Sequence, residues 1–215
     1  MILTGDDTDE VQGGSGNDTI ESGIDSDLVF GEGEDDRIIA GEGSDTVEGG
    51  DGDDLIYGGV APGGSDLFSF DDLIDPTPDN DLDSLVGGAG SDSIFGGDDA
   101  DVLFGGEGDD ALDGGLDDDW IDGGSGSDTV TGGAGADVFV FTAATNLTVT
   151  DFSANDQLLL ADYYTDLQEL LDDFADDAIL NQSFGDFGDS RAMDGSITLI
   201  GADASLLTTD TTGLL

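Results

Sequence analysis

The chain has 215 residues and a formal net charge of −51, because its 53 acidic side chains are accompanied by only two basic ones, Arg37 and Arg191. Nucleic acid and anionic membrane surfaces are bound through Lys and Arg, so this charge argues against both as partners. The absence of Cys and His excludes disulfides, thiolate and imidazole catalysis, and the usual zinc sites. The ligands that remain are carboxylate and carbonyl oxygens, which suit Ca²⁺.

Residues 4–57 consist of six nine-residue repeats: TGDDTDEVQ, GGSGNDTIE, SGIDSDLVF, GEGEDDRII, AGEGSDTVE and GGDGDDLIY. A β-branched aliphatic residue fills the eighth place of each repeat. Aspartate fills the sixth place every time, as Asp9, Asp18, Asp27, Asp36, Asp45 and Asp54. So strict a period indicates one structural unit stacked on itself and not a disordered acidic tract.

The frame is damaged after residue 57 but can still be followed. Segments 61–69 and 78–86 place Asp66 and Asp83 sixth, and the remaining residues of an irregular insertion at about 58–77 predict a surface loop. Because Asp66 breaks the regular spacing, we expect no standard site there.

Six more repeats cover residues 87–140: GGAGSDSIF, GGDDADVLF, GGEGDDALD, GGLDDDWID, GGSGSDTVT and GGAGADVFV. The eighth place is again always apolar. The sixth places are Asp92, Asp101, Asp110, Asp119, Asp128 and Asp137.

The residue types of the repeat predict its structure. Glycines in the first four places allow left-handed backbone angles, so we expect the first six residues to form a tight turn. The last three should form a short strand whose eighth residue points inward. One such strand buries little, so the unit requires parallel stacking of copies. We therefore predict an all-β fold, a parallel β-roll (β-solenoid) over residues 4–140, with two repeats per coil and about seven coils.

In such a coil, residues 18 apart lie above one another. The sixth-place aspartates then form four columns: Asp9, Asp27 and Asp45; Asp18, Asp36 and Asp54; Asp83, Asp101, Asp119 and Asp137; and Asp92, Asp110 and Asp128. Stacked carboxylates repel each other, and a divalent cation in each gap would convert that repulsion into a bridge. The gaps within the columns predict about nine Ca²⁺ ions.

The repeat resembles the RTX (repeats-in-toxin) nonapeptide G-G-x-G-x-D-x-U-x, where U is a large apolar residue, and six copies match every fixed place. In that family one loop supplies its second- and fourth-place carbonyls and its aspartate, and the loop stacked on it supplies first- and third-place carbonyls and its own aspartate. With the aspartates above other than Asp66, the resemblance implies carbonyl ligands at Gly14, Gly16, Gly31, Gly33, Gly50, Gly52, Gly88, Gly90, Gly105, Gly106, Glu107, Gly108, Gly124, Gly126, Gly133 and Gly135.

Five repeats depart from the family pattern at the fourth place, where glycine is expected. An acidic residue stands there in each, namely Asp7, Asp25, Glu34, Asp99 and Asp117. Aspartate tolerates the left-handed region better than most residues, so we expect the turn to persist. The ion sites at these loops are where we expect a departure from the family.

Residues 141–215 lack the nonapeptide, and we expect them to form a cap with short strands and one helix. Segments 149–160 and 195–210 resemble the strand-turn-strand and the last hairpin that close RTX rolls. Between them, a capping box and apolar spacing predict a helix at about 166–180. The same segment is expected to act as an uncleaved type I secretion signal, since the N-terminus does not resemble a cleavable signal peptide.

Together these features predict a secreted calcium-binding β-roll protein without enzymatic activity, located outside a Gram-negative type of cell. Its expected partners are Ca²⁺ and, transiently, a type I secretion ABC exporter; an extracellular polysaccharide or cell-surface matrix is a further candidate. Two alternatives remain open. The chain could be the C-terminal module of a larger secreted hydrolase or epimerase, or a polysaccharide-binding protein in which Trp120 contacts the ligand, although surface packing of Trp120 is favoured.

Overall fold

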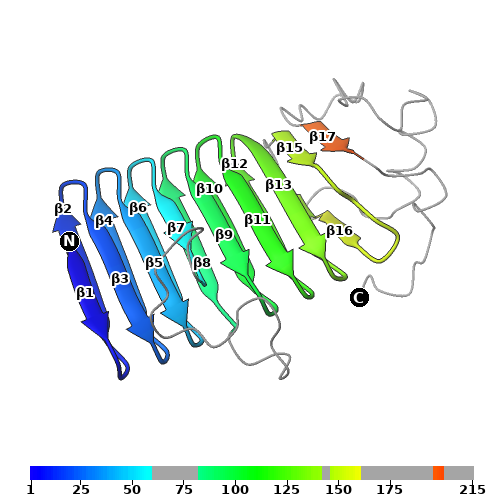
Figure 1. Cartoon of the computed structure of the whole chain (residues 1–215). Helices are drawn as coiled ribbons and strands as arrows, with labels where there is room; N and C mark the ends of the chain where they lie inside the picture. Colours follow the sequence, from blue (N-terminus) through cyan, green and yellow to red (C-terminus); the bar gives the residue numbers. More distant parts are fainter. Residues whose placement is uncertain (60–81, 142–145, 161–195, 201–215) are drawn as a thin grey trace, which may run out of the picture.

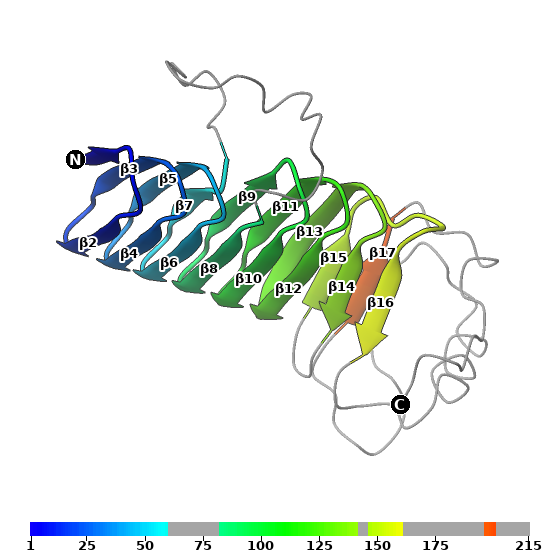
Figure 2. The same ribbon diagram turned by 90° about the horizontal axis from the view of Figure 1, so that it is seen from below.

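The structure is a computed structural model that describes residues 1–59, 82–141, 146–160 and 196–200. These residues form a parallel β-solenoid of two facing sheets, and the predicted β-roll is confirmed (Figure 1, Figure 2). No helix occurs in these ranges, and none of their segments forms a helix able to cross a membrane. The predicted helix at 166–180 lies outside the described residues.

The chain alternates between the two sheets at every half coil. The nine-stranded sheet contains β1 (Ile2–Gly5), β3 (Thr19–Ile24), β5 (Arg37–Glu42), β7 (Leu55–Tyr57), β9 (Ser93–Gly97), β11 (Ala111–Leu116), β13 (Ser127–Ala134), β15 (Asn146–Val149) and β17 (Ser196–Leu199). The eight-stranded sheet contains β2 (Glu10–Ser15), β4 (Leu28–Gly33), β6 (Thr46–Asp51), β8 (Ser84–Ala89), β10 (Val102–Glu107), β12 (Trp120–Ser125), β14 (Val138–Phe141) and β16 (Gln157–Leu160).

The strands are longer than the sequence predicted. A strand was expected only at the seventh to ninth places, but β3 runs on through the first three places of the following repeat. Glycine at the second place has no side chain to separate the coils, so the backbone at Gly23 pairs closely with that at Gly41. The strand therefore continues, and only the fourth to sixth places remain for the turn. The first place is also inward: the small Ser22 and Ala40 there are fully buried.

The core is the predicted column of eighth-place side chains. All of them are buried, from Val11 in β2 to Phe139 in β14. Each contributes about 1.5–3 kcal/mol on burial, but only when a coil stacks on either side and completes its surroundings. At the C-terminal end of the roll, Phe152 packs on Phe139 with ring centroids 5.9 Å apart.

The register confirms that residues 18 apart are neighbours, as in the pair Ile20 and Ile38. Across residues 60–81 this spacing rises to 38, where Val47 of β6 pairs with Leu85 of β8 and Ile56 of β7 pairs with Ile94 of β9. The coils before and after residues 60–81 therefore stack directly on each other, and no coil is missing between them. On the outer face of the nine-stranded sheet the rings of Tyr57 and Phe95 stack at 5.0 Å across this junction, and Arg37 lies over Tyr57.

Parallel pairing also continues beyond residue 140. Strand β15 pairs with β13, β16 with β14, and β17 with β15, so the two segments that resemble closing elements add strands to the roll. The second half of the expected last hairpin lies outside the described residues.

Candidate metal sites

The sixth-place aspartates lie in two rows along the two edges of the roll, where the chain turns from one sheet to the other (Figure 1). Edge A consists of the turns that lead from the nine-stranded sheet to the eight-stranded sheet. Its aspartates are Asp9, Asp27, Asp45, Asp83, Asp101, Asp119 and Asp137. Edge B consists of the turns that lead from the eight-stranded sheet back to the nine-stranded sheet. Its aspartates are Asp18, Asp36, Asp54, Asp92, Asp110 and Asp128. The four columns expected from the sequence are thus two, because the 38-residue register joins them across the insertion.

One oxygen of each stacked carboxylate is held by the coil before it. The main-chain N–H of each aspartate donates to Oδ1 of the aspartate in the next coil, at 2.7–3.1 Å, in six contacts on edge A and five on edge B. These bonds fix the direction of every row carboxylate except those of Asp9 and Asp18, which begin the two rows, and they add the gaps Asp45/Asp83 and Asp54/Asp92 to the nine expected from the sequence.

The other carboxylate oxygen is buried and has no hydrogen-bond donor. This holds for Oδ2 of Asp27, Asp36, Asp54, Asp92, Asp101, Asp110, Asp119 and Asp128, whose residues are at most 4 % exposed. A buried carboxylate oxygen without a partner costs several kcal/mol if charged, so native structures provide a donor or a cation. These oxygens therefore fit a bound cation.

Main-chain carbonyls point into the same gaps. Between the loops of Asp92 and Asp110, a Cβ on Gly106 would collide with the carbonyl of Gly88, and one on Gly108 with that of Gly90. From the other side, the carbonyl oxygen of Gly105 lies 2.6 Å from the Cβ position of Gly87, and that of Glu107 accepts from the N–H of Gly90 at 2.8 Å. The gap thus brings together every group that the family resemblance assigned to it.

The pattern repeats along edge B and at the end of edge A. The carbonyls of Gly50, Gly52, Gly106 and Gly108 each face the equivalent glycine one coil further on, namely Gly88, Gly90, Gly124 and Gly126. Gly133 and Gly135 face the carbonyls of Gly115 and Asp117. At the first gap of edge B, the carbonyl oxygen of Gly31 lies 2.7 Å from the Cβ position of Gly13, and that of Gly33 accepts from the N–H of Gly16 at 3.3 Å. The loop of Gly14 and Gly16 stacks on second- and fourth-place acids, Glu32 and Glu34.

Side chains alone do not form a cluster of metal ligands. Within the described ranges, no three acidic side chains converge on a point that could hold an ion. A cation in these gaps would thus be bound by two carboxylates and by main-chain carbonyls, the mixed oxygen set that Ca²⁺ accepts.

Burial raises the pKa above the ordinary value for nine row carboxyls, namely those of Asp27, Asp36, Asp54, Asp92, Asp101, Asp110, Asp119, Asp128 and Asp137. Desolvation is the main cause, opposed by the hydrogen bond from the preceding aspartate and reinforced by neighbouring carboxylates. The pKa of Asp54 rises to about 6, those of Asp92, Asp101 and Asp128 to about 7, and that of Asp119 to about 8. The fully charged rows are therefore unfavourable without a cation.

The acidic residues at the fourth place do not disrupt the turns. Asp7, Asp25, Glu34, Asp99 and Asp117 all adopt left-handed angles, with φ between 65° and 74°. The carbonyls of Asp25, Glu34 and Asp117 face the next loop as glycine carbonyls do elsewhere. A further acidic residue with a left-handed backbone conformation is Glu32, with φ 81°. It stands at the second place of its repeat and was not anticipated from the sequence.

Replacing Asp117 by glycine is expected to stabilise the calcium-bound roll by about 0.5–1 kcal/mol, because glycine adopts φ 65° without strain. The matched change Asp118→Gly should destabilise it by about 1 kcal/mol, since Oδ1 of Asp118 accepts from the N–H of Ala136 at 2.7 Å. Thermal unfolding at saturating calcium measures both, and equal effects of the two changes would contradict this account.

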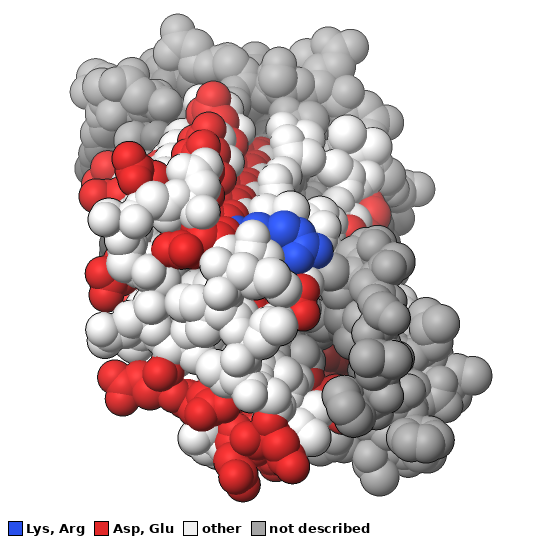
Figure 3. Space-filling view, turned by 60° about the vertical axis from the view of Figure 1, so that its left-hand side comes forward, with Lys and Arg blue, Asp and Glu red and all other residues white. Residues whose placement is uncertain are grey.

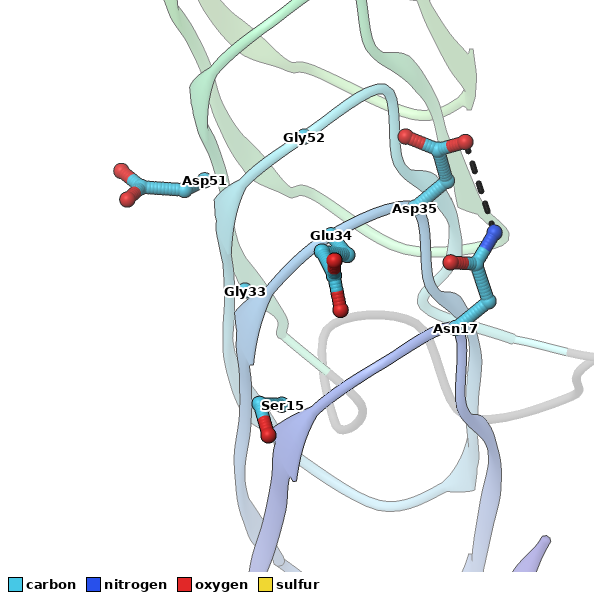
Figure 4. A pocket seen from close by; sticks show the side chains of 7 residues that line it. All are labelled: Ser15, Asn17, Gly33, Glu34, Asp35, Asp51 and Gly52. Carbon is cyan, nitrogen blue, oxygen red and sulfur yellow. Dashed lines mark hydrogen bonds between the residues drawn. The ribbon is translucent and has the colours of Figure 1, made fainter.

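Outside the rows, edge B has an acidic hollow of about 550 Å³ near the N-terminal end, lined by Ser15, Asn17, Gly33, Glu34, Asp35, Asp51 and Gly52 (Figure 4). The side chain of Asn17 donates to Asp35 at 3.4 Å across it. Acidic side chains gather in bands with uncharged surface between them (Figure 3). The hollow opens to solvent and is separate from the buried carboxylates.

Edge A continues one loop further than the repeats suggested. The N–H of Asp137 donates to Oδ1 of Asp156 at 3.3 Å, and Asp151 accepts from the N–H groups of Gly132 and Gly133. The sequence contained the signal, since DFSANDQLL (151–159) has Asp156 sixth and Leu158 eighth. It was missed because this segment has none of the glycines of the repeat.

Trp120 occupies an outward seventh place in β12 and is 37 % exposed. It pairs in register with Val102 and Val138 of the neighbouring coils, which agrees with the surface packing favoured from the sequence.

The fold and the two rows define a parallel β-roll whose edges are built to bind cations. The profile of the RTX calcium-binding nonapeptide repeat matches the chain in four copies, at residues 3–38, 30–60, 78–112 and 104–139, which together cover more than half of it. The chain therefore belongs to the RTX family and is a calcium-binding β-roll protein. No curated protein matches the chain.

Proposed function

We propose that Ca²⁺ ions occupy the gaps between successive aspartates on both edges and that their binding drives folding of the roll. The observation that carries this proposal is the buried Oδ2 without a donor, repeated along each edge. One such oxygen could be a local defect, but a series in the same place of successive coils indicates a common ligand.

Each ion would be bound by the two aspartates of its gap, by the second- and fourth-place carbonyls of one loop and by first- and third-place carbonyls of the next. Bound calcium supplies positive charge that neutralises the row. The chain contributes the rest: the Asp N–H groups orient the carboxylates, and the turns, left-handed at the fourth place, direct the carbonyls. The aspartates of the repeats offer eleven such gaps, six on edge A and five on edge B, and the pair Asp137/Asp156 adds a further one on edge A.

Coupling to folding follows from charge and burial. Without cations, the roll must bury stacked carboxylates in a chain of net charge −51, whereas the unfolded chain keeps them solvated and apart. With calcium, the free energy of binding is added to that of folding, because the unfolded chain has no preformed sites. In the described part of the chain, the internal cations are Arg37 and the N-terminal ammonium, which lies 4.0 Å from Asp18, and these are too few to replace calcium along the rows.

This coupling suits a secreted protein. RTX proteins are typically secreted, and a chain that stays unfolded where calcium is scarce can pass a narrow type I exporter. Outside the cell, millimolar calcium would then fold it. The C-terminal segment is the candidate for the export signal, and its removal is expected to abolish export. The roll itself is assigned a binding role and no catalysis.

Circular dichroism with and without calcium tests the proposal. We expect the far-ultraviolet spectrum to be that of an unfolded chain in excess chelator and that of a β-sheet in about 5 mM Ca²⁺. This concentration lies above the dissociation constants of extracellular calcium modules. Mg²⁺ at the same concentration serves as the control, because its small octahedral shell fits these flexible oxygen sites poorly. An unchanged β-sheet spectrum in chelator would refute the coupling.

A further inference from the structure

The insertion does not lie between two loops of the roll; it interrupts one loop of edge A. Strand β7 ends at Tyr57, and Gly58 and Gly59 follow in the first and second places of a loop. Leu82 and Asp83 occupy the fifth and sixth places of that same loop, immediately before β8. Residues 60–81 thus stand where a regular repeat has only its third and fourth places.

Gly58 has the surroundings of a first-place glycine. A Cβ on Gly58 would collide with Oδ2 of Asp83 and lie 2.8 Å from the carbonyl oxygen of Gly96 in the next loop. In the uninterrupted loop of Asp54, a Cβ on Gly49 would collide with Oδ2 of that aspartate and lie 2.7 Å from the carbonyl oxygen of Gly87. The two stems of the insertion therefore meet in the geometry of one repeat, although 24 residues separate Gly58 from Leu82.

Hydrogen bonds carry edge A through the interrupted loop without a break. The N–H of Asp45 donates to Oδ1 of Asp83 at 2.7 Å, and the N–H of Asp83 donates to Oδ1 of Asp101 at 2.9 Å. The carbonyl of Gly58 accepts from Gly41 at 2.8 Å, and Gly59 donates to Gly96 at 3.1 Å. Asp45, Asp83 and Asp101 are 2 %, 6 % and 1 % exposed, so these carboxylates are as buried as those of regular loops.

We propose that Gly58 and Gly59 on one side of the insertion and Leu82 and Asp83 on the other form a single calcium-binding loop. This inference rests on the proposed function. The gaps Asp45/Asp83 and Asp83/Asp101 then each bind an ion, and these ions tie together the two ends of residues 60–81. The stems of the insertion are held side by side only when calcium is bound.

The site differs from a regular one in a way that the structure specifies. At a regular second place the carbonyl of one loop faces the glycine of the next, as Gly97 faces Gly115. At the interrupted loop, the atoms nearest a Cβ on Gly97 are N and Cα of Gly59, at 3.6 and 3.7 Å. We therefore expect the Asp83/Asp101 gap to bind calcium more weakly than the regular gaps, by roughly tenfold for the loss of one carbonyl ligand.

Two alanine substitutions beside the insertion test the assignment. Gly58→Ala places a methyl group against Asp83 and should remove up to two ions from the calcium count, read by native mass spectrometry of the full chain. Ser84→Ala is the control, because Ser84 stands in the outward seventh place of β8, directly after the same loop, and is not one of its residues. An unchanged count in Gly58→Ala would overturn the proposal.

A repaired loop gives a test that does not depend on a damaging substitution. Replacing residues 60–81 by Ser-Gly creates GGSGLDSLV, which matches every fixed place of the repeat. If the interrupted loop already binds calcium, the native and repaired chains bind the same number of ions, and Asp83→Asn lowers that number equally in both. A higher count in the repaired chain would show that the native loop is not a calcium loop. Failure of every chain to bind calcium would instead refute the proposed function itself.

Discussion

Replacing Asp110 by asparagine is expected to destabilise the roll in calcium and to stabilise it in chelator. Asparagine retains an oxygen that can accept from the N–H of Asp92, so the hydrogen bond along edge B survives. It removes the charge of a carboxylate that is 3 % exposed and that is shared by the gaps on either side. A tenfold loss of affinity in each gap corresponds to about 3 kcal/mol in total. Without calcium, the removal of one buried charge is expected to raise the free energy of unfolding instead of lowering it.

The neighbouring substitution Asp109→Asn is the control for charge alone. Asp109 is exposed at the fifth place, and its Oδ1 accepts from the N–H of Ser127 at 2.9 Å, a bond that asparagine also preserves. Both variants lose one negative charge, and the two positions are adjacent in the chain. Urea unfolding at saturating calcium and in chelator measures the four free energies. Equal losses in the two variants in calcium would mean that position in the row is irrelevant and that only net charge matters.

Lowering the pH is expected to fold the chain partly in the absence of calcium. The pKa values of three row carboxyls in the folded chain lie well above the ordinary 3.8, at about 6 for Asp54, about 7 for Asp92 and about 8 for Asp119. The folded chain therefore binds protons more tightly than the unfolded one. This contribution is complete below about pH 4 and is lost as the pH rises through about 6 to 8.

Protons and calcium should consequently compete for the same oxygens. The β-sheet content in chelator is expected to rise from pH 8 to pH 4, while calcium affinity falls over the same range, because each ion must displace protons from its carboxylates. Circular dichroism in chelator and calorimetric titration at several pH values provide both curves. A calcium-free chain that is equally unfolded at pH 4 and pH 8 would contradict the claim that charge on the buried row carboxyls opposes folding.

Much of this architecture follows from the repeat alone. A fixed Asp at the sixth place and an apolar residue at the eighth predict a core column and two edges, because a period of nine closes only when two repeats form one coil. Ile20, Ile56 and Phe139 lie where that rule places them. The strand length was underestimated, because glycine was read only as a turn residue. At the first and second places, glycine instead permits close approach of neighbouring backbones.

The interrupted loop could not be predicted from the spacing. Reading segment 61–69 as a degenerate repeat placed Asp66 in the frame, whereas the structure pairs Val47 directly with Leu85 and Ile56 with Ile94. Segment 61–69 itself lies outside the described residues. The choice depends on which pairing buries more of the chain, and this is a property of the stacked coils. Asp156 was missed for the converse reason, since its position in the row depends on register and not on the flanking glycines.

Anomalous diffraction from a crystal grown in calcium tests the central claim most directly. We predict two rows of anomalous peaks, one along each edge, with each peak between successive row aspartates and peaks about 4.8 Å apart along a row, the spacing of neighbouring strands. Peaks confined to the outer surface of the edges, or a roll without peaks between Asp92 and Asp110, would contradict it.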